Sequence, residues 1–127
     1  MEDILKENQA SSEAKTTENK YRSPMNLHRE LDDYGLDPYE FRVYSHVARR
    51  AGRHRVCFSK VSDMATVCKM SPRKVRYSLR FLCEAGLISE EKRQGSTTKY
   101  RLRPMEEWID SAALEKTRQT LKSKNQK

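Results

Sequence analysis

A cluster of cationic side chains in the middle of the chain could bind phosphate groups or the edges of bases. Within eight residues the sequence places Arg73, Lys74, Arg76 and Arg80, with Tyr77 among them. An arginine presents a planar fork of N–H donors that suits phosphates and the O6 and N7 acceptors of guanine. The cluster therefore predicts recognition of a polyanion, and the elements around it decide whether a duplex could be reached.

The cluster lies on a predicted helix that begins at Pro72 and stops at Gly86. Ser71 can accept a backbone N–H as the N-cap, proline suits the first helical position, and glycine suits a left-handed stop. Apolar residues recur at helical spacing and define a buried stripe of Val75, Leu79, Leu82 and Cys83. The remaining surface of the helix then carries Arg73, Arg76, Tyr77 and Arg80.

Another predicted helix precedes this one across a short turn. Ser59 or Ser62 could cap it, and its inward side chains are Val61, Met64, Ala65 and Cys68. Lys69 and Met70 form the turn, where we expect a left-handed backbone at Lys69. Two short helices joined in this way form a helix-turn-helix, and a helix about 10–12 Å across fits the major groove of B-DNA.

Upstream elements complete a three-helix core. Asp37, Pro38 and Glu40 form a capping-box helix start, and this helix is predicted to run to about residues 51–52 with Phe41, Tyr44, Val47 and Ala48 inward. Residues 56–58 are predicted to form a short strand that can join the β-hairpin, or wing, predicted further along the chain. Residues 23–33 are predicted to form a further short helix, with Leu27 and Leu31 facing inward and Gly35 closing it.

A predicted β-hairpin follows the cationic helix. Residues 89–92 and 97–103 flank the turn-forming residues 94–96, and in the return strand Tyr100 and Leu102 alternate with Lys99, Arg101 and Arg103. Glu90 and Glu91 could pair with Lys99 or Arg101 across the hairpin, so part of this charge could serve the hairpin itself. Lys92 and Arg93, near the tip, have fewer obvious partners.

The segment CFSKVSDMATVCKMSPRKVRYSLRFLCEAGLIS resembles the winged helix-turn-helix domains of bacterial and phage regulators and replication proteins. The residues that carry the resemblance are Met64-Ala65, Cys68, Met70-Ser71, Lys74-Val75, Leu79, Leu82 and Gly86-Leu87-Ile88. It departs from the family pattern at Cys68, where leucine is usual, and at Lys69, where glycine is common. The resemblance covers roughly residues 37–103 and implies a mainly α fold with a small β-hairpin wing that binds DNA.

The chain is expected to divide into three parts. Residues 1–22 are polar and predicted to be disordered, residues 23–103 form the winged helix-turn-helix domain, and residues 104–127 form a C-terminal helix and basic tail. Pro104 is predicted to begin that helix, with Glu106 and Glu107 in its first turn. Its apolar residues either cover the core, the favoured alternative, or pair two subunits: Trp108, Ile109, Ala112, Ala113 and Leu121.

Charge is concentrated on the predicted domain. Residues 42–103 carry 16 Lys and Arg against 4 Asp and Glu, a net charge of +12, whereas the rest of the 127-residue chain carries 10 against 14. Such concentration favours a polyanion through counterion release, so binding should weaken steeply with salt; the alternative is a merely solvated surface. No signal peptide or membrane span is recognised, and we expect a cytoplasmic protein.

Residues with catalytic or metal-binding potential are sparse. Cys57, Cys68 and Cys83 lack a Cys-x-x-Cys spacing and read as small apolar fillers. A metal site that combines them with His46 or His54 is conceivable, but its spacing matches no zinc pattern. No phosphate loop, nucleotide fingerprint or paired-carboxylate site occurs, so we expect neither enzyme activity nor a cofactor.

The sequence thus predicts a protein that binds double-stranded DNA sequence-specifically, with Arg73 and Arg76 as the main base readers. The full set of predicted contacts is Lys69, Ser71, Arg73, Lys74, Arg76, Tyr77, Arg80, Lys92, Arg93, Lys99 and Arg101. A small transcriptional regulator, possible as a homodimer through its terminal helices, is slightly favoured over a plasmid or phage replication initiator or accessory protein. A protein-interaction module and an RNA-binding protein are the further alternatives.

Overall fold

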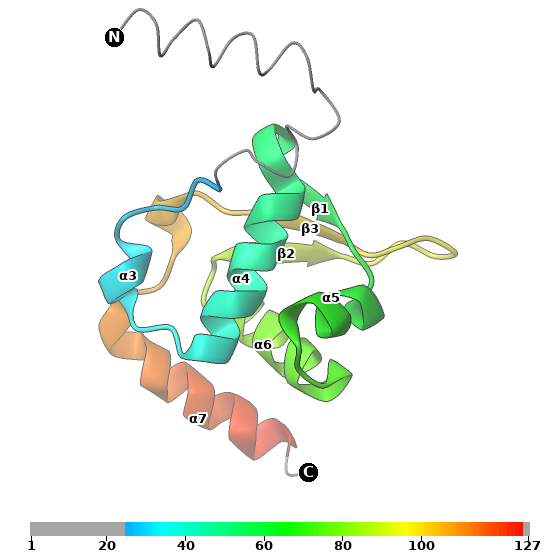
Figure 1. The fold of residues 1–127 in the computed structure, drawn as a ribbon. Helices are drawn as coiled ribbons and strands as arrows, with labels where there is room; N and C mark the ends of the chain where they lie inside the picture. Colours follow the sequence, from blue (N-terminus) through cyan, green and yellow to red (C-terminus); the bar gives the residue numbers. More distant parts are fainter. Residues whose placement is uncertain (1–24, 126–127) are drawn as a thin grey trace, which may run out of the picture.

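Helices α4, α5 and α6 pack around one face of a small sheet, with α7 laid across the outside (Figure 1). The computed structural model describes residues 25–125, so the predicted disordered tail at residues 1–22 lies outside the described residues. In chain order the helices and strands are α3 (Leu31–Tyr34), α4 (Pro38–Ala51), β1 (Val56–Phe58), α5 (Val61–Cys68), α6 (Pro72–Glu84), β2 (Ile88–Glu91), β3 (Lys99–Leu102) and α7 (Leu114–Asn125). This confirms the predicted order of helix, strand, helix, helix, strand, strand.

The start of α4 is fixed by a reciprocal cap. Asp37 Oδ1 accepts the backbone N–H of Glu40 at 2.7 Å, and Glu40 Oε1 accepts the backbone N–H of Asp37 at 2.8 Å. The backbone N–H groups of Asp37 and Glu40 would otherwise be left without a partner at the start of the helix. The capping box and the helix end at Ala51 are therefore confirmed.

The turn between α5 and α6 has the predicted geometry. Lys69 adopts a left-handed backbone, with φ 56° and ψ 52°, and Ser71 Oγ accepts the backbone N–H of Lys74 at 3.1 Å. The expected serine cap of α5 is wrong, because Lys60 is the N-cap and provides no side-chain bond. Ser59 is buried instead, with its Oγ 3.3 Å from Nε2 of His46.

The sheet joins strands that are distant in sequence. Its order is β1-β3-β2, all antiparallel, with Tyr100 opposite both Cys57 and Glu90. The predicted addition of the short strand to the wing is thus confirmed. Tyr100 and Cys57 are buried, so one sheet face packs on the helices while alternate residues point outward.

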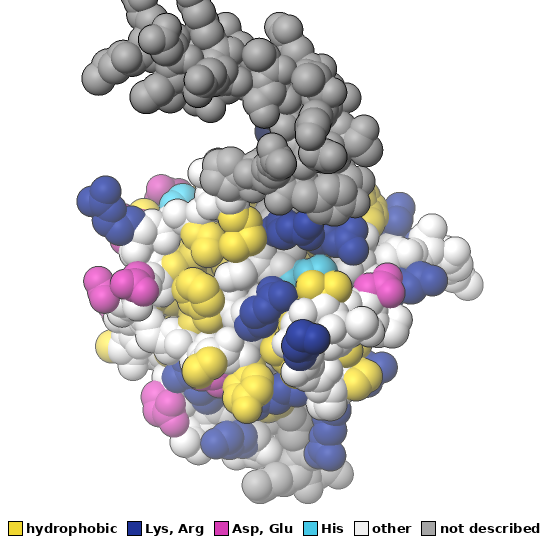
Figure 2. All heavy atoms as spheres, viewed as in Figure 1, with side chains coloured by type: hydrophobic (Ala, Val, Ile, Leu, Met, Phe, Trp, Pro, Cys, Tyr) yellow, Lys and Arg dark blue, Asp and Glu magenta, His cyan; other side chains and the backbone are white. Residues whose placement is uncertain are grey.

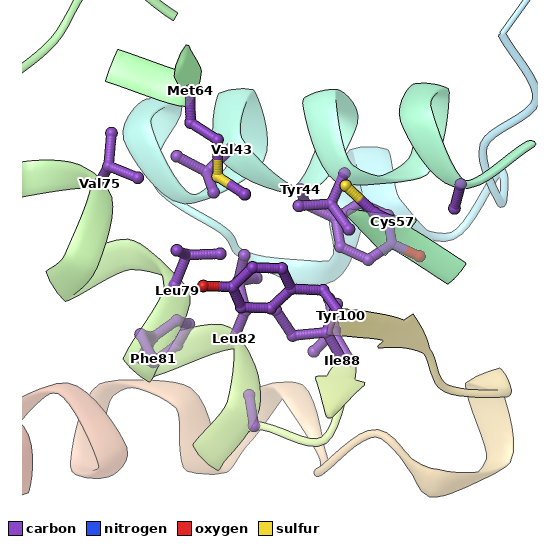
Figure 3. Close-up of a cluster of buried hydrophobic side chains, with 14 of the residues drawn as sticks. Val43, Tyr44, Cys57, Met64, Val75, Leu79, Phe81, Leu82, Ile88 and Tyr100 are labelled. Atoms are coloured by element: carbon purple, nitrogen blue, oxygen red, sulfur yellow. The ribbon is translucent and has the colours of Figure 1, made fainter. Parts of the chain in front are cut away.

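The core lies where α4 and α6 meet this sheet (Figure 3). Its side chains include Val43, Tyr44, Met64, Val75, Leu79, Leu82, Ile88 and Tyr100. The predicted inward stripe of α4 is partly wrong: Val43 is fully buried, whereas Phe41 and Ala48 are only half-buried. Because α4 contacts α5, α6 and the sheet, its buried surface is rotated toward Val43.

The predicted helix over residues 23–33 is mostly wrong. Residues 23 and 24 lie outside the described residues. From residue 25 onward the predicted segment is helical only in α3, Leu31–Tyr34, and the N-cap residue Glu30 provides no side-chain bond. Gly35 ends the helix in a left-handed conformation, with φ 113°, as expected. Leu31 is buried and Leu27 half-buried, so the apolar contacts predicted for a helix are made by a largely non-helical segment.

The helix predicted from Pro104 does not form there. Met105–Glu107 and Ser111–Ala113 are short 3₁₀ turns, and the α-helix begins at Leu114. The reason is backbone pairing, because Ile109 donates its N–H to the carbonyl of Ala85 at 2.9 Å. Gly86 permits this approach: its φ is 85°, and a Cβ there would collide with the carbonyl oxygen of Glu107.

The apolar residues after the wing pack within the chain, which is the alternative that the sequence favoured. Trp108 and Ile109 are half-buried against the core, and Leu121 is buried. Leu114, which the prediction omitted, is buried too, whereas Ala112 is exposed. None of the helices within residues 25–125 is long and apolar enough to span a bilayer.

Candidate nucleic-acid interface

Three arginines share one exposed edge of α6. Arg73, Arg76 and Arg80 are separated by three and four residues, so they follow one another along the helix, and all three are exposed. The opposite side of α6 is fixed in the core by Val75, Leu79 and Leu82. The guanidinium groups are therefore presented outward on a helix whose rotation is set by packing, as the periodicity predicted.

The wing faces part of this edge across a hollow. Arg76, Arg80 and Glu84 of α6 line it together with Glu90 and Lys92 from the hairpin. Lys92 Nζ lies 3.9 Å from a carboxylate oxygen of Glu90, and its side chain is 86% exposed. Such an exposed pair is weak, so Lys92 can reach a phosphate that approaches α6. Glu84 and Glu90, absent from the predicted site, place carboxylates beside the arginines.

Lys74 and Tyr77 lie beside the arginine edge of α6, and Lys74 lies toward Tyr39. The Nζ atom of Lys74 is 4.3 Å from the ring centroid of Tyr39 and 5.5 Å from that of Tyr77. Tyr77 is half-buried against the core, and burial is the main cause that raises the pKa of its phenol, followed by the Glu40 carboxylate. Tyr77 thus packs against the core on one side, and on its other side it lines a small hollow together with Arg73, Arg76 and Arg80.

The start of α6 offers polar groups of its own. Lys69 is exposed in the turn, and Ser71 is exposed at the N-cap. The Ser71 hydroxyl oxygen accepts the N–H of Lys74, which leaves the hydroxyl proton available as a donor. Because the N-terminus of a helix carries partial positive charge, these groups suit a phosphate.

Arg93 has more partners than the sequence suggested. Its Nε and Nη2 donate to the carbonyl oxygen of Thr97 at 3.1 and 3.0 Å, which closes the hairpin loop. Its guanidinium carbon lies 4.9 Å from the ring centroid of Phe58, a residue that is 53% exposed. Arg93 therefore braces the wing against β1, and its contribution to a ligand would be secondary.

Lys99 and Arg101 lie on the outer face of the sheet. They alternate with buried Tyr100, so their side chains point away from the face that packs on the helices. Lys99 Nζ is 3.7 Å from a carboxylate oxygen of Glu91, its cross-strand neighbour, as the sequence predicted. The structure therefore brings Lys92 to α6 but directs Lys99 and Arg101 elsewhere.

The sequence did not indicate the role of Arg118, which packs against the buried side of α6. Arg118 of α7 donates from Nε and Nη2 to the two carboxylate oxygens of Glu40, at 3.0 and 2.8 Å. Its guanidinium carbon also lies 4.9 Å from the ring centroid of Phe81, on α6. The carboxylate raises the pKa of Arg118 above its usual range. The partners are 78 residues apart, and no local pattern indicates the pairing.

The cysteines are buried or half-buried thiols. Burial raises the pKa of Cys57 to about 11 and that of Cys83 to about 12, so neither is a ready nucleophile. Among residues 25–125, no group of three or more His, Cys, Asp and Glu side chains could hold a metal ion. The expectation of no metal or cofactor for the whole chain stays a prediction.

The helices around the arginine edge match a known family. Residues 34–88 match the model of a helix-turn-helix domain family. A solved structure of the YusO protein from Bacillus subtilis is 16% identical, with 98% of this chain and 82% of that chain covered and a TM-score of 0.45. No curated protein matches the chain. The match covers α4, β1, α5 and α6 and ends at the start of β2. In the structure β2 and β3 add a hairpin wing after these helices, so the arrangement of the elements is that of a winged helix-turn-helix fold.

Proposed function

We propose that the protein binds double-stranded DNA sequence-specifically by placing α6 in the major groove. The observation that carries this proposal is the row of exposed arginines at positions 73, 76 and 80, on a helix fixed in the core of a helix-turn-helix domain. An α-helix fits the major groove, and arginine is the side chain that most often reads guanine there. An exposed protein-docking helix would instead be expected to show apolar side chains.

The surroundings of α6 suggest a role for each predicted contact. Arg73 and Arg76 are the proposed base readers, with Arg80 beside them, while Lys69, Ser71 and Lys92 are proposed to contact phosphates. Arg93, Lys99 and Arg101 would act at the margin through the wing. Lys74 and Tyr77, which lie against neighbouring elements, are proposed to contribute least.

Within DNA binding, we propose a small cytoplasmic transcriptional regulator of the bacterial or phage type. A helix-turn-helix regulator that binds as a dimer occupies two half-sites that lie one helical turn, or a multiple of it, apart. Footprinting a site selected from random and host DNA would report this spacing and the stoichiometry. Directly repeated sites bound by monomers would instead indicate a replication role, and preference for RNA in a competition assay would contradict the proposal.

The decisive experiment is a titration of the selected site at fixed salt with single variants. Arg76→Ala should cost about 1–3 kcal/mol and relax the sequence preference, because a base contact is lost. Lys92→Ala should weaken all sequences alike and lower the salt slope by about one, because a phosphate contact is lost.

Lys116→Ala is the matched control, since Lys116 is exposed on α7. It should leave both the affinity and the salt slope unchanged. If Arg76→Ala and Lys92→Ala both bind like the unmodified protein, α6 and the wing do not form the DNA-binding surface.

A further inference from the structure

One outer face of the molecule, away from the arginine edge of α6, carries acidic side chains on one side, apolar side chains in the middle and basic side chains on the other side. Figure 2 shows acidic side chains over α3, hydrophobic side chains in the middle and Lys or Arg side chains over α4. The acidic side includes Asp32, and the basic side includes Arg42 and Arg49. These side chains lie on the outer surface formed by α3 and by the solvent-exposed side of α4.

The middle of this face is an apolar groove of about 730 Å³. Met25, Leu31, Leu36 and Phe41 line it, and Met25 is 45% exposed. Ser45 also lines the groove, and within residues 25–125 its buried hydroxyl has no hydrogen-bond partner. A buried hydroxyl without a partner is costly, so the groove offers both apolar contacts and an unused polar group to an occupant.

The charges that flank the groove are not neutralised by the rest of the described chain. Within residues 25–125, neither Asp32 nor Arg49 forms an ion pair, and Arg42 donates only to the backbone carbonyl of Val67. By contrast, the wing and α7 pair several of their charges. An apolar centre between charged margins has the composition of a protein–protein interface.

We propose that the occupant of this groove is a second copy of the chain, related by a two-fold axis. In such a dimer the same patch meets itself, so a residue i of one copy contacts j of the other and j contacts i. With the axis through the apolar groove, Asp32 of each copy faces Arg42 and Arg49 of the other. The acidic and basic margins are therefore complementary to themselves, which is the property an isologous contact needs.

This surface is independent of the proposed DNA contact. Arg42 and Arg49 are on the exposed side of α4, whereas Val43 and Val47 on its other side are buried in the core with α6. The apolar residues Leu114 and Leu121 of α7 are already buried within the chain. A dimer through α3 and α4 would leave the arginine edge of α6 open in both copies.

Sedimentation equilibrium of the full chain over a wide concentration range tests the proposal. We expect a species of twice 14.9 kDa. Asp32→Arg or Arg49→Asp alone should raise the dimer dissociation constant at least about tenfold, because each change places like charges opposite one another twice per dimer. The double variant Asp32→Arg with Arg49→Asp should have a lower dimer dissociation constant than Asp32→Arg alone, because the pair between positions 32 and 49 is restored in reverse while Arg42 still faces a like charge.

Two controls keep the test specific. Met25→Asp, at an exposed position in the groove, should weaken the dimer without unfolding the chain, and Arg76→Asp on α6 should leave the dissociation constant unchanged. A monomer at every concentration, including one whose residues 1–24 cover the groove, overturns the proposal. A dimer that is insensitive to both single charge reversals overturns it too.

Discussion

Arg118 on α7 and Arg76 on α6 show two different uses of arginine in one small domain. The side chain of Arg118 is only 17% exposed, and it binds both carboxylate oxygens of Glu40 and the backbone carbonyl of Gly35. Arg76 is exposed, and within residues 25–125 it forms no ion pair. The same side chain therefore stabilises the fold in one place and remains available to a ligand in the other.

The two arginines are connected through α6. Phe81 is fully buried on that helix and lies under the guanidinium of Arg118, whereas Arg73, Arg76 and Arg80 follow the exposed edge. Glu40 also caps α4 through Asp37. The pair of Glu40 and Arg118 thus links the start of α4 to α7, and the Arg118 guanidinium contacts the buried side of the proposed recognition helix. Both arginines carry the same charge, so the structural role of Arg118 and the proposed binding role of Arg76 are distinguished only by their burial and by their hydrogen-bond and ion-pair partners.

The largest effect that we expect is on stability, from Arg118→Ala. Glu40 is 1% exposed, so loss of its guanidinium leaves a buried carboxylate uncompensated. Removing one partner of a buried ion pair costs about 3–5 kcal/mol. The free energy of unfolding from urea titration measures this loss, with Arg76→Ala as the matched control that should change it by less than about 0.5 kcal/mol. Equal effects of the two variants would contradict the contrast between them.

The buried His46 shows a third effect of arginine, because nearby guanidinium groups that do not bind it still lower its pKa. His46 is 2% exposed, and its pKa is lowered to about 4 by burial first, then by Arg50, Arg42 and Arg49. In the unfolded chain its pKa is near 6.5, so the unfolded state takes up a proton first as the pH falls. Its contribution to stability is complete above pH 6.5 and declines by about 1.4 kcal/mol per pH unit between pH 6.5 and 4.

Urea titrations at pH 7, 6 and 5 would measure this decline. His46→Gln removes the titrating group, so the part of the slope that belongs to this residue should disappear in the variant. Carboxylates titrate mainly below pH 5 and affect both proteins alike. An identical slope in the two proteins would show that His46 is protonated as easily when folded as when unfolded.

Features that depend on a few neighbouring residues could be predicted from the sequence. The capping box at Asp37, the N-cap at Ser71 and the left-handed Lys69 each follow from local backbone needs. The exposed arginines of α6 also follow locally, because the apolar stripe fixes which side of the helix is buried. The positions of Arg73, Arg76 and Arg80 on the exposed edge of α6 could therefore be predicted from the sequence.

Features that depend on distant contacts could not be predicted. The segment after Pro104 has a favourable helix start, yet the backbone bond from Ile109 to Ala85 outweighs that preference. The contact of Arg93 with Phe58 joins residues that meet only after the sheet forms. For the same reason, the sequence could not distinguish Arg93, which braces the wing, from Lys92, which faces α6.

The smallest expected effect distinguishes the arginine edge of α6 from the side that carries Lys74. Lys74 lies over the rings of Tyr39 and Tyr77, whereas Arg73, its neighbour in sequence, is on the exposed edge. Arg73→Ala should therefore weaken specific DNA binding by about 1 kcal/mol or more, and Lys74→Ala by less than about 0.5 kcal/mol at the same salt concentration. Binding titrations with the footprinted site measure both. If Lys74→Ala proves the more costly variant, α6 must meet the groove with the side that carries Lys74, and Arg76 and Arg80 would then contact backbone rather than bases.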